Sequence, residues 1–219
     1  MINTTFCRCV FSAALALTLL CTSSFADPVV IYDNNAGGPT GLNNGYQSDP
    51  HSGQIQADEF ELQVESIIGR IEWTGLYAGN DSPQDDSFTI HIFEDAGGSP
   101  LGGTPVASFS PGNNVNRTDS GTNFAGLDVY EYSVDLMFVA DPDTSYWLSI
   151  INDTTNDPND NWYWGTNTSF GNNHRSFNNG ATWQQIGART DFRLLSIPEP
   201  ASGLVVSVAS ALALIRRRR

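Results

Sequence analysis

The sequence predicts an all-β protein over residues 27–197, folded as an antiparallel β-sandwich of the jelly-roll type. Apolar residues recur at every second position, as in Phe88, Ile90 and Ile92, and this period is typical of strands that bury one face. Clusters of Gly, Pro, Asn and Asp separate such segments and favour turns. No long window in this range has apolar residues at the helical period of 3.6, so we expect many short strands joined by turns.

The expected strands follow one another along the chain without an internal repeat. They are residues 29–32, 56–62, 67–77, 88–93, 106–109, 130–136, 145–151, 161–165, 182–186 and 191–196. The expected turn-rich segments between them are 34–45, 79–86, 97–103 and 111–121.

Residues 1–26 have the plan of a secretory signal peptide. Arg8 precedes an apolar run over 10–21, and Ser24 and Ala26 are the small residues that signal peptidase accepts. We therefore expect cleavage after Ala26, with Asp27 as the new N-terminus. A buried N-terminal helix is the alternative for this segment.

All cysteines of the chain lie in this N-terminal segment. They are Cys7, Cys9 and Cys21. Cleavage would leave a domain without disulfides, thiolate metal sites or a cysteine nucleophile. Cys21 could instead carry the lipid of a bacterial lipoprotein, but Leu20 stands where that signal has a small residue.

The last segment, 198–219, has three parts in a fixed order. Pro198-Glu199-Pro200 comes first, a run over 201–215 broken only by Ser and Gly follows, and a basic cluster ends the chain. As a helix the apolar run is about 22 Å long, shorter than the hydrocarbon core of about 30 Å. The basic cluster should stay on the cytoplasmic side of a membrane. It consists of Arg216, Arg217, Arg218 and Arg219.

This tripartite tail resembles the PEP-CTERM sorting signal of Gram-negative bacteria. The resemblance implies an exported precursor held at the inner membrane by a short transmembrane helix and then processed by an exosortase, with Pro198-Glu199-Pro200 as the recognition element. The protein would end at the cell surface or in the extracellular matrix. An ordinary C-terminal anchor helix with chance prolines is the alternative.

Several phrases of the domain are also similar to those of secreted β domains that carry this tag. They are Tyr32-Asp33-Asn34, Ala57-Asp58-Glu59-Phe60-Glu61-Leu62, Ile71-Glu72-Trp73-Thr74-Gly75-Leu76-Tyr77 and Tyr146-Trp147-Leu148-Ser149-Ile150. Most such domains have no assigned activity, so the resemblance bears on fold and location alone.

The charge of the domain excludes several classes of function. Segment 27–197 has five basic against 23 acidic residues, which leaves a formal net charge of −18. Such a surface repels phosphate backbones, which argues against nucleic-acid binding. The chain has no lysine, so a Lys nucleophile or Schiff base is also excluded.

Catalytic patterns are sparse. The histidines are His51, His91 and His174, and none has the spacing of metal ligands. No G-x-S-x-G motif marks a nucleophile. A glycosidase needs a pair of carboxyl groups, and Glu72 beside Trp73 is the best single candidate. The full set of candidate glutamates is Glu61, Glu72, Glu94 and Glu131.

Calcium is a more plausible ligand than zinc. Loop 152–161 has three carboxylates, from Asp153, Asp157 and Asp160, among several amide side chains. Hard cations bind several oxygens converging from one flexible loop. Smaller clusters are Asp81, Asp85 and Asp86, and Asp141-Pro142-Asp143. Solvated turns are the alternative, because Asn and Asp also form turns unaided.

Trp162 and Trp164 occupy one face of a predicted strand, about 7 Å apart by strand rise. Such a pair could stack on sugar rings, or it could fill the core of the sandwich. The sequence as a whole favours a non-catalytic, structural or adhesive role in an extracellular polysaccharide matrix. Carbohydrate binding through the two tryptophans is the alternative, and a glycan hydrolase using Glu72 is a third hypothesis.

Overall fold

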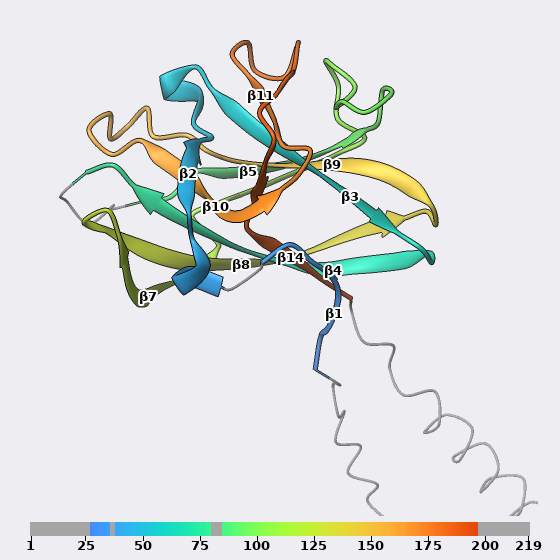
Figure 1. The fold of residues 1–219 in the computed structure, drawn as a ribbon, viewed down its shortest axis with the longest axis horizontal. Helices are drawn as coiled ribbons and strands as arrows, with labels where there is room; N and C mark the ends of the chain where they lie inside the picture. The colour runs from blue at the N-terminus through green and yellow to red at the C-terminus, as the bar shows by residue number, and fades with distance from the viewer. Residues whose placement is uncertain (1–26, 36–37, 80–84, 197–219) are drawn as a thin grey trace, which may run out of the picture. The chain divides into compact units, whose positions relative to one another are not determined.

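The computed structural model describes residues 27–35, 38–79 and 85–196, and these ranges form an all-β fold with antiparallel sheets (Figure 1). The coarse fold class predicted from the sequence is therefore confirmed. Only two short 3-10 turns interrupt the described strands, η1 (Gly38–Gly41) and η2 (Pro50–Ser52). Within these ranges no helix is long and apolar enough to cross a membrane. The helices expected in 1–26 and 198–219 lie outside the described residues.

One sheet has eight strands and has β4 at its centre. β4 pairs with β8 on one side and with β14 and then β10 on the other. The strands of this sheet are β1 (Val29–Asp33), β2 (Asn44–Gln47), β4 (Ser66–Tyr77), β7 (Asn116–Phe124), β8 (Leu127–Ala140), β10 (Trp162–Phe170), β13 (Ala188–Thr190) and β14 (Phe192–Ser196).

The other sheet has six strands in the order β12-β11-β3-β9-β5-β6. They are β3 (Ile55–Leu62), β5 (Phe88–Glu94), β6 (Ala107–Gly112), β9 (Thr144–Asn152), β11 (His174–Ser176) and β12 (Gln184–Gln185). The turn between β3 and β4 carries the chain from this sheet to the other.

A single large core joins the two sheets, as expected of a sandwich. Its residues come from alternate positions, such as Phe88, Ile90 and Ile92 on β5 and Tyr132 and Val134 on β8. The alternation read from the sequence is thus the alternation of buried and outward side chains. Burial of these apolar surfaces is the main favourable term in the stability of the fold.

Glycine allows one close approach inside the core. A Cβ on Gly75 would lie 2.6 Å from Cζ2 of Trp162, so any side chain there would displace the indole. Trp162 also meets Phe88 edge-on, with ring centroids 5.2 Å apart. The aromatic packing around Trp162 therefore depends on the missing side chain at position 75.

The first and last strands of the domain are partners. Val29 of β1 pairs with Ser196 of β14, and β14 lies between β1 and β4 (Figure 1). The two ends of the described domain therefore lie side by side at one end of this sheet.

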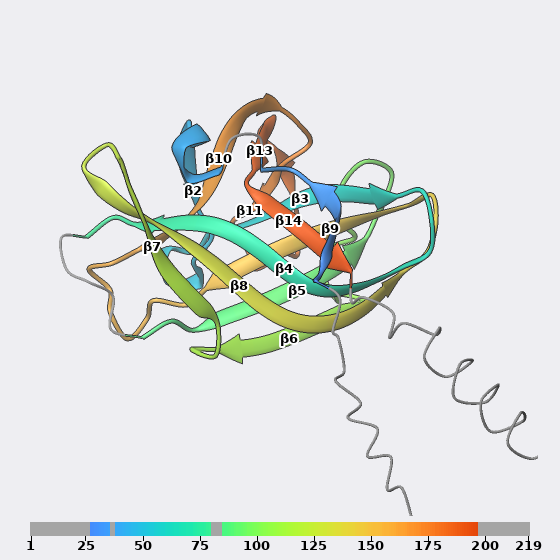
Figure 2. The same ribbon diagram turned by 90° about the horizontal axis from the view of Figure 1, so that it is seen from below.

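Two strands were predicted wrongly as turns. β7 and β2 lie in segments rich in Asn, Gly, Asp and Ser, and β7 has no fully buried residue. Figure 2 shows β7 at the margin of the sheet beside β8. Polar residues stand at the half-buried as well as the exposed positions of β7, so the strand has no apolar alternation and its sequence resembles that of a loop.

Candidate functional site

A polar pocket of about 230 Å³ opens on the outer face of the eight-stranded sheet. We call it the Glu72 pocket. Its walls include Asn35, Glu72, Thr74, Glu131, Ser133 and Arg193.

Strand register brings these side chains together. Glu72 of β4 is opposite Ser133 of β8, and Thr74 is opposite Glu131. The intervening Trp73 and Tyr132 point into the core, so their neighbours point outward. Of the four glutamates that the sequence singled out, Glu72 and Glu131 therefore share one pocket.

The other two candidate glutamates lie elsewhere. Glu61 is on β3 and Glu94 is on β5, both in the six-stranded sheet. Neither is part of the Glu72 pocket.

An ion pair crosses the floor of the pocket. Arg193 of β14 is opposite Glu72, and its Nη2 lies 2.9 Å from Oε2 of that glutamate. The Nε of Arg193 and the Oδ1 of Asn35 are buried and have no hydrogen-bond partner among the described residues. Both atoms are enclosed, so the polar groups open to a ligand are the exposed side chains of Asn116, Thr118 and Glu131 in the pocket wall.

Asp191 lies beneath this pocket. Its Oδ2 accepts a hydrogen bond of 2.6 Å from Oγ1 of Thr74. Burial raises the pKa of Asp191 to about 7, against the lowering effects of Thr74 and Arg193, and the charges of Asp33 and Glu131 raise it further. Because Asp191 is only 1 % exposed, it positions Thr74 and has no direct access to a ligand.

The tryptophan pair, for which the sequence left sugar stacking and core packing open, is part of the core. Trp162 and Trp164 are both 0 % exposed, and Nε1 of Trp164 donates to the backbone oxygen of Asp191. Neither ring has a free face for a sugar, so stacking by this pair is ruled out in the folded domain. The predicted alternation of side chains along β10 is confirmed. The sequence did not show which face of the strand points into the core.

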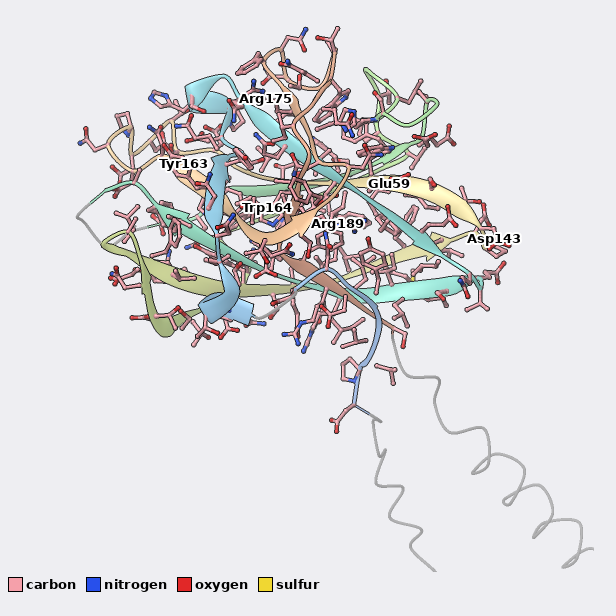
Figure 3. All side chains as sticks on the ribbon, in the orientation of Figure 1. Glu59, Asp143, Tyr163, Trp164, Arg175 and Arg189 are labelled. Carbon is pink, nitrogen blue, oxygen red and sulfur yellow. The ribbon has the colours of Figure 1, made fainter. Side chains whose placement is uncertain are left out.

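Tyr163, the residue between them, is on the outer side of β10 (Figure 3). It lines a second, mostly apolar pocket of about 190 Å³ with Leu76, Phe124 and Leu127. This aromatic side chain is available to a ligand where the tryptophans are not.

In loop 152–161 two of the predicted calcium ligands take part in turns. Asp153 accepts hydrogen bonds from the backbone and hydroxyl of Thr155, and the backbone oxygen of Asp157 accepts one from the amide of Asp160. The side chain of Asp160 is buried against Gly79. Among the residues that the structure describes, no three His, Cys, Asp or Glu side chains are grouped to hold a metal ion. Calcium binding by Asp153, Asp157 and Asp160 stays a prediction.

Of the smaller acidic clusters, the one that includes Asp86 has a structural role, whereas Asp141 and Asp143 are exposed between β8 and β9. Asp86 accepts a hydrogen bond of 3.1 Å from Arg117, and Tyr77 and Asn152 donate to the same carboxylate. Asp81 lies outside the described residues. The Asp86 cluster joins strands β4, β7 and β9 at one end of the fold.

A buried acidic residue that the sequence reasoning missed is Asp58. Its Oδ2 accepts hydrogen bonds from the amide and hydroxyl of Thr190, at 2.6 and 3.0 Å, and from Asn34. Burial raises the pKa of Asp58 to about 6, although the Thr190 hydrogen bonds and Arg189 lower it. The signal in the sequence was an aspartate between the apolar Ala57 and Phe60 of a predicted strand.

The residues predicted to act in sorting and signal cleavage lie outside the described ranges, except Asp27. Ala26 lies outside the described residues, as do Pro198, Glu199, Pro200 and the four terminal arginines. Asp27 is the first described residue, and it is exposed.

The chain matches no protein-family model, no curated protein and no solved structure at a significant level. Its functional interpretation therefore depends on its own residues.

Proposed function

We propose that the protein is an exported, non-catalytic domain of the jelly-roll type that acts at the cell surface or in an extracellular polysaccharide matrix. The observation that supports this most is the pairing of β1 with β14. The described strands form a complete two-sheet fold between the two predicted signals, so removal of either signal leaves all of them in place. Signal peptidase and an exosortase are the partners that this role requires.

Replacing Pro198-Glu199-Pro200 with three alanines is expected to leave the unprocessed protein in the inner membrane. The measurement is intact mass in fractions of the native host, where the wild type should begin at Asp27 and end near Pro200, outside the inner membrane. The matched control is Pro142→Ala, which removes an exposed turn proline of the domain. Normal processing of the triple variant would contradict the sorting role.

A second function is favoured by the Glu72 pocket, which we propose binds a neutral saccharide. The exposed side chains of Asn116, Thr118 and Glu131 in its wall can donate to and accept from hydroxyl groups. The pocket is smaller than the roughly 300–1,000 Å³ of sites for drug-sized ligands, which suits a single hydroxylated ring. Glu131 and the other carboxylates of the acidic domain repel anionic sugars.

Binding without hydrolysis fits the arrangement of the carboxyl groups better than catalysis. Glu72 is engaged by Arg193. Asp191, whose raised pKa would suit a general acid, is enclosed beneath Thr74. A general acid must reach the oxygen that it protonates.

Glu131→Gln is expected to weaken saccharide binding about tenfold, because hydrogen bonds to a charged group contribute roughly 1.5–3 kcal/mol. Titration calorimetry with maltotriose, cellotriose and triacetylchitotriose measures this, and a reducing-end assay on the same sugars detects hydrolysis. Glu94→Gln, an exposed glutamate of the other sheet, is the control. Equal affinity of the Glu131→Gln and Glu94→Gln variants, or no binding of any of the three sugars, would contradict this proposal.

A further inference from the structure

A row of exposed apolar side chains lies at one end of the eight-stranded sheet. Ile67 on β4 is directly opposite Val139 on β8, and Met137 is two residues from Val139 on the same face. Their side chains are 46 %, 51 % and 68 % exposed. We call these three residues the apolar row.

The apolar row is contiguous. Paired residues of an antiparallel sheet have Cβ atoms about 5 Å apart, and residues two apart on one strand are about 7 Å apart. Single exposed apolar residues are ordinary on protein surfaces, whereas adjoining ones indicate a contact surface.

The described chain ends beside this row. Ser196, the last residue of β14, pairs with Ile68 of β4, and Ile68 pairs with Phe138 of β8. Neighbouring strands are about 4.8 Å apart, so the row lies about 10 Å from the end of β14. Val29 and Val30 of β1 are exposed at the same end of the sheet.

A short stretch of chain separates Ser196 from the apolar segment 201–215. The five steps from Ser196 to Ala201 span at most about 17 Å when fully extended. That segment is shorter as a helix than a bilayer core, and a short span draws its flanking residues toward the bilayer. In the anchored precursor the end of β14 must therefore stay close to the membrane surface.

We propose that the apolar row rests on the zwitterionic lipid surface of the membrane in which 201–215 is anchored. This inference depends on the proposed anchoring of the precursor and adds an orientation to it. Burial of the row in the interface removes apolar side chains from water. Glu65 and Asp141, in the turns at the same ends of β4 and β8, would be repelled by anionic lipids.

The test uses the chain from Asp27 to Arg219, which has no cysteine, in phosphatidylcholine vesicles. Single nitroxide labels are placed through Ile67→Cys, Met137→Cys, Phe177→Cys and Ala209→Cys. Phe177 is the matched control, because it is an exposed apolar residue just after β11, which lies at the top of Figure 1 whereas β1 lies at the bottom. Collision rates with oxygen and with an aqueous nickel chelate report whether each label meets lipid or water.

Labels at positions 67 and 137 are expected to show a several-fold higher ratio of oxygen to nickel collisions than the label at 177. Phosphatidylglycerol in the vesicles should reduce that difference. If the label at 209 is in lipid but the label at 137 matches the label at 177, the orientation is wrong and the anchor stands.

Two further results would also overturn the inference. If the label at position 209 is in contact with water, both the proposed anchoring and the proposed orientation are wrong. Dipolar coupling between labels at 137 without lipid contact would show that a second copy of the chain covers the row.

Discussion

Trp162→Ala is expected to lower the free energy of unfolding by about 3–5 kcal/mol, the usual cost of removing a large aromatic side chain from a core. Trp162 is fully buried, in ring contact with Phe88 and Tyr132, and Gly75 lies against its indole without a side chain that could fill the vacancy. The cavity therefore cannot close without a shift of β4 or β5. Urea unfolding of the wild-type and variant proteins measures the loss.

Tyr163→Ala is the control for this experiment. Tyr163 is next to Trp162 but only half-buried on the outer side of β10, so a smaller loss of stability is expected. A Trp162 variant that lost a ligand while keeping its stability would contradict the burial and restore the carbohydrate-stacking hypothesis.

The second large effect is on pH dependence. Lowering the pH from 8 to 5 is expected to raise the free energy of unfolding by roughly 2–4 kcal/mol, because one pKa unit corresponds to about 1.4 kcal/mol and burial lowers the pKa of His91, which opposes part of the gain. The folded protein has raised pKa values at Asp58, about 6, and Asp191, about 7, against 3.8 as the ordinary value. Between the ordinary pKa of 3.8 and the raised values of about 6 and about 7, the folded state binds more protons than the unfolded state. The free energy of unfolding therefore increases as the pH falls toward 4.

The acidic surface also makes the folded protein more stable as the pH falls. A net charge of −18 in segment 27–197 destabilises the folded state by self-repulsion, and protonation relieves it. The pKa of Asp95 is lowered by hydrogen bonds from Trp147 and from the amides of residues 97–99, despite partial desolvation. Below about pH 4 that carboxylate loses these bonds, so stability should pass through a maximum.

Asp191→Asn separates burial from surface charge. The variant is expected to be more stable than the wild type at pH 8 and to gain less between pH 8 and 5. Asp128→Asn removes one exposed carboxylate of β8 and should leave the slope nearly unchanged. Melting temperatures at several pH values measure both, and parallel curves for the wild type and Asp191→Asn would refute the role of the buried carboxyl.

The fold could be predicted from the sequence where one face of a strand is buried. β5 showed this clearly, because its apolar side chains recur at every second position and meet the core. β7 could not be found, because its polar residues contact water on both faces and its pairing with β8 depends on backbone hydrogen bonds. Backbone pairing leaves no pattern in residue type.

The site could be predicted only in part, for a related reason. Glu72 was singled out by its place beside Trp73, but its association with Glu131 and Arg193 depends on the register of three strands. Register is fixed by which faces are buried across the whole sheet and is not local in sequence. The burial of Asp58 likewise depends on Thr190, which is 132 positions away along the chain.

The place of β14 between β1 and β4 bears on the order in which this domain folds. Val29 and Ser196 are 167 positions apart, and within the described chain β1 pairs with no other strand. Contacts this distant in sequence form late, because the intervening chain must be ordered before they are gained. β1 therefore stays without a strand partner until β14, the last strand of the domain, has joined the sheet. The eight-stranded sheet is consequently complete only when the two ends of the described domain have come together.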